Sequence, residues 1–359
     1  MLIFFWIIII GATLIKRPRV FPIIVTAFLV KLNYNAVNVA DFFAYNGIYN
    51  HISATQLYQT GYGWYVLNNA GRNLGIDYNM YKTYSVLLCM VVMWSVSRLL
   101  IGESSNLIFG LYLLYPALLD TIQLRFFTAV TISLIGILFL SKQKAWSTFV
   151  YVIIIIAAAT IHTSVLFYLI FAAYPLISKY RDKIKYIVVG LTILLIALKS
   201  KLYTFVSLFS NDRQMQYFDK SAGVTSGSSY LLITAIISIF LLYFINSQVY
   251  SKVKEDISFS EVDKRNVETI SGISLMMFFI IPLVILSGEF FRAFRIMFIL
   301  TYMSLAILNG NNKKITFNHL SYGDQKIQLD PRIIGFIIAL LGFTVNIMYF
   351  SPLAYTSYF

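Results

Sequence analysis

The chain has 359 residues, of which 59% are hydrophobic and 12% are charged, and its mean hydropathy is +0.76. A soluble domain carries about 25% charged residues, so this chain has too few polar side chains to coat a water-soluble globule of its length. The composition predicts an all-α polytopic membrane protein that forms a single integral membrane domain over residues 1–359. The net charge of +13 first suggests nucleic-acid binding, an interpretation that depends on where the basic residues lie.

Apolar runs divide the chain into about twelve predicted transmembrane helices. They cover residues 1–15, 20–35, 81–100, 106–119, 126–140, 146–160, 164–177, 184–198, 229–245, 270–286, 291–307 and 333–350. Residues 1–11 lack a basic region and a small-residue cleavage site, so they are interpreted as part of a first span and not as a signal peptide. The single cysteine, Cys89, lies in an apolar run and excludes an intramolecular disulfide.

Lysine and arginine residues are distributed unequally between alternate loops. One set of loops holds 18 of the 28 basic residues, and it includes the loops at 16–19, 179–185, 247–269 and 308–332. The positive-inside rule predicts that this set is cytoplasmic, so both termini and the loops at 33–82 and 208–228 lie outside. Basic residues placed in this way are topogenic signals, and the nucleic-acid interpretation is therefore dropped.

The long outer loop at 33–82 is predicted to fold back on the membrane. Leu57, Tyr58, Tyr62, Tyr65 and Val66 recur at helical spacing, which predicts an amphipathic helix in the interface. Two interpretations stay open: a structural helix, or a platform on which sugars stack. In the second interpretation, the sugar-contacting residues are Tyr45, Tyr62 and Trp64.

Ionisable residues stand singly among apolar residues on the predicted outer side, where they are costly to hold. Asp41 lies in such a setting, and a partly desolvated carboxylate is suited to act as a general base. Asp120 and Arg125 either pair with each other or leave Arg125 to bind a phosphate. His162 either closes a helical hairpin as a satisfied polar group or contacts substrate; His51 and His319 lack the spacing of metal ligands, so no metal site is predicted.

Glu289, Arg292 and Arg295 follow one another at intervals of three residues and are predicted to line one side of a helix. Two arginines one turn apart present two planar forks to the same volume, which matches a pyrophosphate. A structural pair between Glu289 and an arginine is the alternative.

These motifs, in this order, resemble those of the EpsG family of Wzy-type polysaccharide polymerases. The similar elements are Asp41-Phe-Phe-Ala-Tyr45, Gln59-Thr-Gly61-Tyr62, Leu124-Arg125-Phe-Phe-Thr-Ala129, Ile161-His162-Thr-Ser164 and Arg292 with Arg295. The chain departs from the family pattern at Gln59, where the family has Glu, and at Phe126, where it has Gln.

The resemblance implies a multi-pass enzyme of the bacterial cytoplasmic membrane with its active site facing outside or the periplasm. It would join undecaprenyl-pyrophosphate-linked repeat units into a surface polysaccharide, with a flippase and a chain-length regulator as partners and without a cofactor. Arg125, Arg292 and Arg295 would then bind pyrophosphate. The catalytic residues would be Asp41 or Glu289 as the base and His162 as a hydrogen-bond donor to sugar or phosphate. A transferase that uses a polyprenyl-phosphate sugar, and a flippase for lipid-linked oligosaccharides, are the alternatives.

Overall fold

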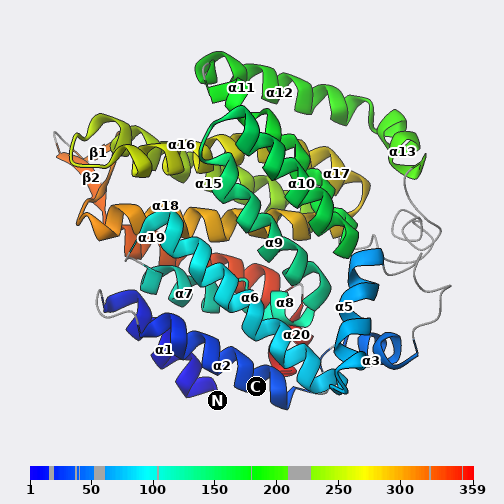
Figure 1. Cartoon of the computed structure of the whole chain (residues 1–359). Coiled ribbons are helices and arrows are strands. Elements are labelled where there is room, and N and C mark those ends of the chain that lie inside the picture. The colour runs from blue at the N-terminus through cyan, green and yellow to red at the C-terminus, as the bar shows by residue number, and fades with distance from the viewer. Residues whose placement is uncertain are drawn as a thin grey trace.

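A computed structural model of the chain describes residues 1–15, 20–36, 39, 41–51, 61–102, 105–178, 180–208, 228–322, 325–349 and 351–359. Helices dominate it (Figure 1). In chain order the elements of the first half are α1 (Leu2–Leu14), α2 (Phe21–Asn35), α3 (Phe42–Asn50), α5 (Tyr62–Asn73), α6 (Tyr78–Ile101), α7 (Ser105–Leu114), α8 (Ala117–Ile122), α9 (Leu124–Leu140), α10 (Ala145–Ile161), η1 (Thr163–Ala173) and α11 (Tyr174–Ser178). Those of the second half are α12 (Arg181–Ala197), α13 (Lys199–Leu208), α15 (Ser228–Glu255), α16 (Glu261–Met276), η3 (Met277–Phe279), α17 (Ile280–Leu286), η4 (Gly288–Arg295), α18 (Ile296–Gly310), β1 (Ile315–Tyr322), β2 (Gln325–Leu329), α19 (Pro331–Gly342), η5 (Phe343–Tyr349) and α20 (Pro352–Thr356).

The helical membrane architecture predicted from composition is confirmed. In the part of the chain that the structure describes, five helical stretches are long and apolar enough to cross a membrane. They are Tyr78–Ile101, Leu232–Glu255, Glu261–Leu286, Gly288–Gly310 and Pro331–Tyr349. Shorter apolar helices accompany them at Leu2–Leu14, Leu124–Leu140, Ala145–Ile161 and Thr163–Ala173. Each predicted span falls on a helix, while the number of twelve crossings stays a prediction.

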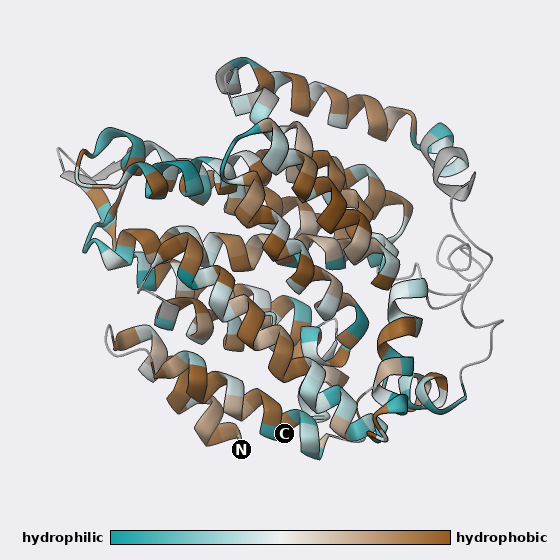
Figure 2. Ribbon diagram, in the orientation of Figure 1, coloured by the Kyte–Doolittle hydropathy of each residue, from teal (hydrophilic) through white to brown (hydrophobic). Residues whose placement is uncertain are grey.

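The segments predicted to lie outside and those predicted to lie inside gather at opposite ends of the helix bundle. Figure 1 shows α3, α5 and α13 at one end, which we call the α5 end, and the β1–β2 hairpin and the α15–α16 connection at the other. In Figure 2 the stretches between these ends are mainly hydrophobic, whereas hydrophilic colour concentrates at the α15–α16 connection and around α3 and α5. The arrangement agrees with the alternation of loops that the basic residues predict.

α18 lies at the centre of the bundle and packs against α7, α15 and α19. A buried polar cluster fixes it to α15: the Asn246 amide donates to Thr301 Oγ1 at 2.8 Å, and the Ser304 hydroxyl donates to Asn246 Oδ1 at 2.7 Å. Since helices surrounded by lipid gain little from apolar contact with each other, hydrogen bonds of this kind help to set their register.

One correction concerns the loop at 308–332, where no regular structure was predicted in an all-α fold. The structure has an antiparallel hairpin there, in which Ile315 pairs with Leu329 and Phe317 with Ile327. Residues such as Ile315, Thr316 and Phe317 have high strand propensity. The basic residues of this loop were interpreted as topogenic signals, and the strand propensity of their neighbours was not considered.

The amphipathic helix predicted in the outer loop is α5. Leu57 and Tyr58, on which its predicted start depends, lie outside the described residues, and the helix begins at Tyr62. Tyr62 and Val66 are exposed on one face, whereas Trp64 and Asn68 are buried on another. The predicted separation into two faces is therefore present from Tyr62 onward.

Candidate functional site

Glu289, Arg292 and Arg295 all lie on η4, which is a 3-10 helix of 8 residues. A 3-10 helix has three residues per turn, so side chains three positions apart lie directly above one another. These three residues therefore form one charged column, and Phe291 and Phe294 form a second, aromatic column with ring centroids 5.7 Å apart. The Ser287 hydroxyl caps the start of η4 by accepting a hydrogen bond from the Glu289 amide at 3.4 Å.

Arg295 extends from this column to two polar side chains at α8 and at the junction of α8 and α9. Its Nη1 lies 3.3 Å from Asp120 Oδ1, and its Nη2 donates to Gln123 Oε1 at 2.6 Å. The side chains of Arg295 and Asp120 are 4% and 2% exposed. The Tyr112 hydroxyl donates to the other carboxylate oxygen at 3.1 Å. Asp120 is thus paired with Arg295, and the alternative of an Asp120–Arg125 pair is not the arrangement found.

Burial dominates the electrostatics of Asp120, which lies in the connection between two predicted spans. Removal from water raises the pKa of its carboxyl to about 6, although the Arg295 charge and the Tyr112 hydrogen bond both lower it. The carboxylate is therefore charged near pH 7 and gains a proton under mildly acidic conditions.

Arg292 is less buried than Arg295 and is paired within its own helix. Its Nη2 forms an ion pair with Glu289 Oε2, and its Nε donates to the Glu289 carbonyl oxygen at 3.0 Å. The side chains of Arg292 and Glu289 are 22% and 37% exposed. This pair is the structural alternative considered for Glu289, and it also leaves both side chains accessible from outside the core.

His162 lies at the junction of α10 and η1, beside the three arginines. Arg125, Arg292 and Arg295 all act electrostatically on its ring. The ring of Phe126 lies between His162 and Arg295. The Arg295 guanidinium lies over this ring at 4.8 Å from its centroid, and the His162 ring meets it edge-on at a centroid distance of 5.3 Å. Phe126, where the chain departs from the family pattern, thus separates the cation from the imidazole.

The surroundings of His162 keep it uncharged. Burial lowers the pKa of the imidazole well below its usual value, and the neighbouring arginines lower the pKa further. Its Nδ1 accepts a hydrogen bond from the Ser164 amide at 3.3 Å, so the neutral ring carries its proton on Nε2. The ring can therefore donate one hydrogen bond from Nε2 to a substrate oxygen.

The start of α5 packs tightly against the end of α10, directly before His162. A Cβ atom added to Gly63 would lie 2.3 Å from Thr160 Oγ1, and one added to Gly61 would lie 2.6 Å from the Thr160 carbonyl oxygen. Gly61 also has a positive φ of 87°, which other residues rarely adopt. Glycine at both positions lets α5 approach the turn that carries His162.

The three predicted sugar-contacting residues lie in different environments. Tyr62 is 65% exposed at the start of α5, whereas Trp64 is 1% exposed. The Trp64 ring packs against Tyr45 and Tyr81, each at a centroid distance of 6.1 Å. Tyr45 is half-buried, so Tyr62 is the most exposed member of the set.

Asp41 is half-buried and precedes the first residue of α3. Its charge acts on Tyr78 at the start of α6. Lys82 of the same helix holds the preceding chain, since its ammonium donates to the Ala36 carbonyl oxygen at 2.6 Å and lies 4.9 Å from the Phe42 ring centroid. Asp41 is therefore placed beside α6, whereas Glu289 is the predicted base that lies in the charged column.

Two features of this region escaped the sequence analysis. Gln123 and Tyr112 were not considered as site residues, although both bind members of the Asp120–Arg295 pair.

Within the described residues, no group of three or more His, Cys, Asp or Glu side chains is arranged to hold a metal ion. The predicted outer loop at 208–228 consists almost wholly of residues beyond those that the structure describes.

Comparison with known families supports the resemblance drawn from the motifs. The chain matches the EpsG family over residues 16–322. It belongs to the EpsG family. All the predicted site residues fall within the matched range, and the family supports a polymerase-type role in polysaccharide synthesis. Searches of curated proteins and of solved structures gave no match.

Proposed function

We propose that this EpsG-family protein polymerises undecaprenyl-pyrophosphate-linked oligosaccharide repeats on the outer face of the bacterial cytoplasmic membrane. The observation that carries the proposal is the convergence of Arg125, Arg292 and Arg295 on His162. Arg125 belongs to α9 and the other two to η4, so segments far apart in sequence supply one cationic site. A site of this charge suits a leaving group with two phosphates.

In the proposed reaction, a hydroxyl of the terminal sugar on one repeat unit attacks the anomeric carbon of the sugar bound to pyrophosphate on the growing chain. A new carbon–oxygen bond forms, and the bond from the anomeric carbon to the pyrophosphate oxygen breaks. The electron pair of that bond leaves with undecaprenyl pyrophosphate, and the hydroxyl proton passes to a base. Growth by one repeat unit follows.

Each site residue has a distinct role in this reaction. Arg292 and Arg125 neutralise the pyrophosphate as its negative charge increases, and Arg295 contributes its field from the buried pair with Asp120. Glu289 accepts the proton when the substrate phosphate takes its place beside Arg292. His162 donates from Nε2 to a sugar or phosphate oxygen. Asp41 is the alternative base.

The position of Asp41, beside Tyr78 of α6, favours a second candidate function. In it, the protein transfers a single sugar from a polyprenyl phosphate, and an acidic residue of the outer loop acts as base. A flippase is the third candidate.

Analysis of lipid-linked glycans in a deletion strain separates these functions. A polymerase deletion accumulates complete single repeats on the lipid carrier at the outer face. Repeats that lack one sugar would indicate the monosaccharide transferase, and complete repeats held at the inner face would indicate a flippase. Turnover of a synthetic lipid-linked repeat by the purified protein would establish the reaction directly.

Sidedness has its own test, made in a Cys89→Ser background. Cysteines introduced at Ser53 or Ser226 should react with an impermeant maleimide in intact cells, whereas those at Ser251 or Ser321 should react only after lysis. Labelling of the second group in intact cells would put the arginine site on the wrong side of the membrane for this function.

A further inference from the structure

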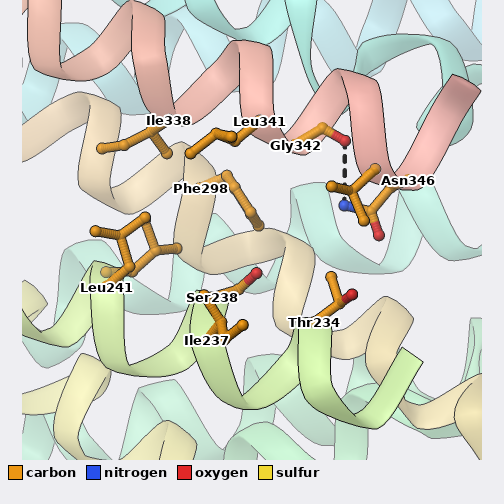
Figure 3. A pocket seen from close by; sticks show the side chains of 11 residues that line it. Thr234, Ile237, Ser238, Leu241, Phe298, Ile338, Leu341, Gly342 and Asn346 are labelled. Carbon is orange, nitrogen blue, oxygen red and sulfur yellow. Dashed lines mark hydrogen bonds between the residues drawn. The ribbon is translucent and has the colours of Figure 1, made fainter. Parts of the chain in front are cut away.

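An apolar cleft opens between α15 and α19, with α18 as its floor (Figure 3). Its volume is about 130 Å³. Its lining comes from three helices that are distant in sequence and is mainly apolar. It includes Ile237 and Leu241 from α15, Phe298 from α18, and Ile338 and Leu341 from α19, with Thr234, Ser238 and Asn346 as its polar members. Such a lining favours a hydrocarbon and disfavours a sugar, which would lose hydrogen bonds to water there.

A row of aromatic rings leads from the candidate site to this cleft. Phe291 and Phe294 form the aromatic column of η4, and Phe294 contacts Phe298 at a centroid distance of 5.7 Å. Phe298 is one helical turn beyond Arg295 and lines the cleft. The three rings are buried, so this row packs η4 onto the floor of the cleft and places the charged column about one helical turn from it.

The flanks of the cleft are apolar and exposed. Ile233, Ile237 and Phe240 on α15, and Ile337 and Leu341 on α19, all have large exposed fractions. In a membrane protein, exposed side chains of this kind along the middle of apolar helices face lipid tails. The cleft therefore opens towards the hydrocarbon of the bilayer, not towards water.

We propose that this cleft binds the first isoprene units of a polyprenyl pyrophosphate, an inference that rests on the function proposed above. The charged column holds the pyrophosphate, and the cleft, which begins one helical turn beyond Arg295, takes the start of the chain. Because the cleft is small, it holds only the part of the chain next to the pyrophosphate, and the remainder lies among the bilayer lipids. An acyl chain of an ordinary phospholipid lacks this fixed relation to the arginines.

Photo-crosslinking tests the position of the chain. The probe is a polyprenyl pyrophosphate with a diazirine on its second isoprene unit, added to the purified full-length protein in nanodiscs. We expect crosslinks on α15, Phe298 and α19, which an excess of unlabelled polyprenyl pyrophosphate competes away. Equal labelling of the same residues by a phosphatidylglycerol with a diazirine in its acyl chain would assign the cleft to bulk lipid and overturn the proposal.

A matched pair of variants tests the importance of the cleft for turnover. Ser238→Phe puts a ring into the cleft, whereas Ile233→Phe puts the same ring on the exposed face of the same helix, outside the lining. We expect Ser238→Phe to raise the KM for the lipid-linked repeat about tenfold and to reduce crosslinking in parallel. Ile233→Phe should match the unmodified protein.

Crosslinking and KM test the lipid site, whereas polymer formation tests the proposed function, so either hypothesis can be rejected without the other. Specific crosslinks in the cleft without polymer formation would support the lipid site and reject the polymerase. Polymer formation with crosslinks elsewhere and a normal KM in Ser238→Phe would reject the lipid site and leave the polymerase intact.

Discussion

Asp120 and Arg295 form an ion pair that is almost completely removed from solvent, with Oδ1 and Nη1 3.3 Å apart. The pair joins α8 to η4, and Gln123 and Tyr112 hold it from both sides. Its geometry gives Arg295 a fixed direction beside Phe126 and His162. The guanidinium is thus positioned before any substrate arrives, which lowers the cost of reorganising the site during reaction.

The first prediction concerns the partners of Arg295. Asp120→Leu removes both carboxylate oxygens and leaves a buried cation, so it should lower the free energy of unfolding by about 3–5 kcal/mol. Asp120→Asn also removes the counter-charge of Arg295 but should cost less, because its amide oxygen still accepts a hydrogen bond from the guanidinium. Thermal unfolding in detergent measures both.

A double variant separates the structural role of this pair from its functional role. Asp120→Leu with Arg295→Met replaces the ion pair by apolar side chains and should recover most of the lost stability without restoring polymer formation. Recovery of activity in the double variant would show that Arg295 has no part in the reaction.

The second prediction concerns pH. Since the folded-state pKa of Asp120 is about 6 and its ordinary value is 3.8, the folded protein binds this proton more tightly than the unfolded chain between these values. The contribution of Asp120 to the free energy of unfolding is therefore largest below about pH 4 and falls as the pH rises to about 6. Unfolding followed from pH 4 to pH 7 should show this slope in the unmodified protein and lose it in Asp120→Asn. Identical slopes would mean that Asp120 titrates normally.

The third prediction separates the two arginines of the charged column. Arg292→Lys should lower turnover of the lipid-linked repeat roughly 10- to 100-fold, because a point charge replaces the planar two-pronged donor. Its expression and unfolding should be nearly unchanged, since its side chain is partly exposed. Arg295→Lys should lower both turnover and stability, because the guanidinium can no longer bind Asp120 and Gln123 at the same time. Full activity of Arg292→Lys would remove this residue from the pyrophosphate site.

The fourth prediction concerns the contact between α5 and α10. Gly63→Ala should displace α5 from Thr160, at a cost of about 1–3 kcal/mol, and should reduce turnover by moving the turn that carries His162. Gly47→Ala is the matched control, since a Cβ atom on this α3 glycine would meet no atom within 4 Å. If both variants are equally active, the docking of α5 has no influence on the site.

Hydropathy predicted the helices well, because lipid forces every backbone polar group to be satisfied within a helix. The Asp120–Arg295 pair was not predicted because its members lie far apart in the chain. Arg125 is the basic residue nearest to Asp120 in the sequence and was therefore the partner considered. Pairing across a bundle depends on how α8 packs beside η4, which no local pattern encodes. The β1–β2 hairpin was missed for a different reason, since its strands are short and lie in a polar loop.

The spacing of Glu289, Arg292 and Arg295 is relevant to the type of helix that these residues form. Intervals of three residues fit the period of a 3-10 helix better than the 3.6-residue period of an α-helix. Even so, the sequence could not decide between them, because the choice depends on the packing of η4 against η1 and α17.

The 3-10 backbone of η4 makes the charged column sensitive to winding. Successive residues turn by about 120° in a 3-10 helix and by about 100° in an α-helix, so rewinding η4 would rotate Arg295 by about 120° relative to Glu289 over six residues. The charges would then spread around the helix and no longer face one substrate. A local change of helix type, without any movement of whole domains, is thus sufficient to assemble or dismantle the cationic face.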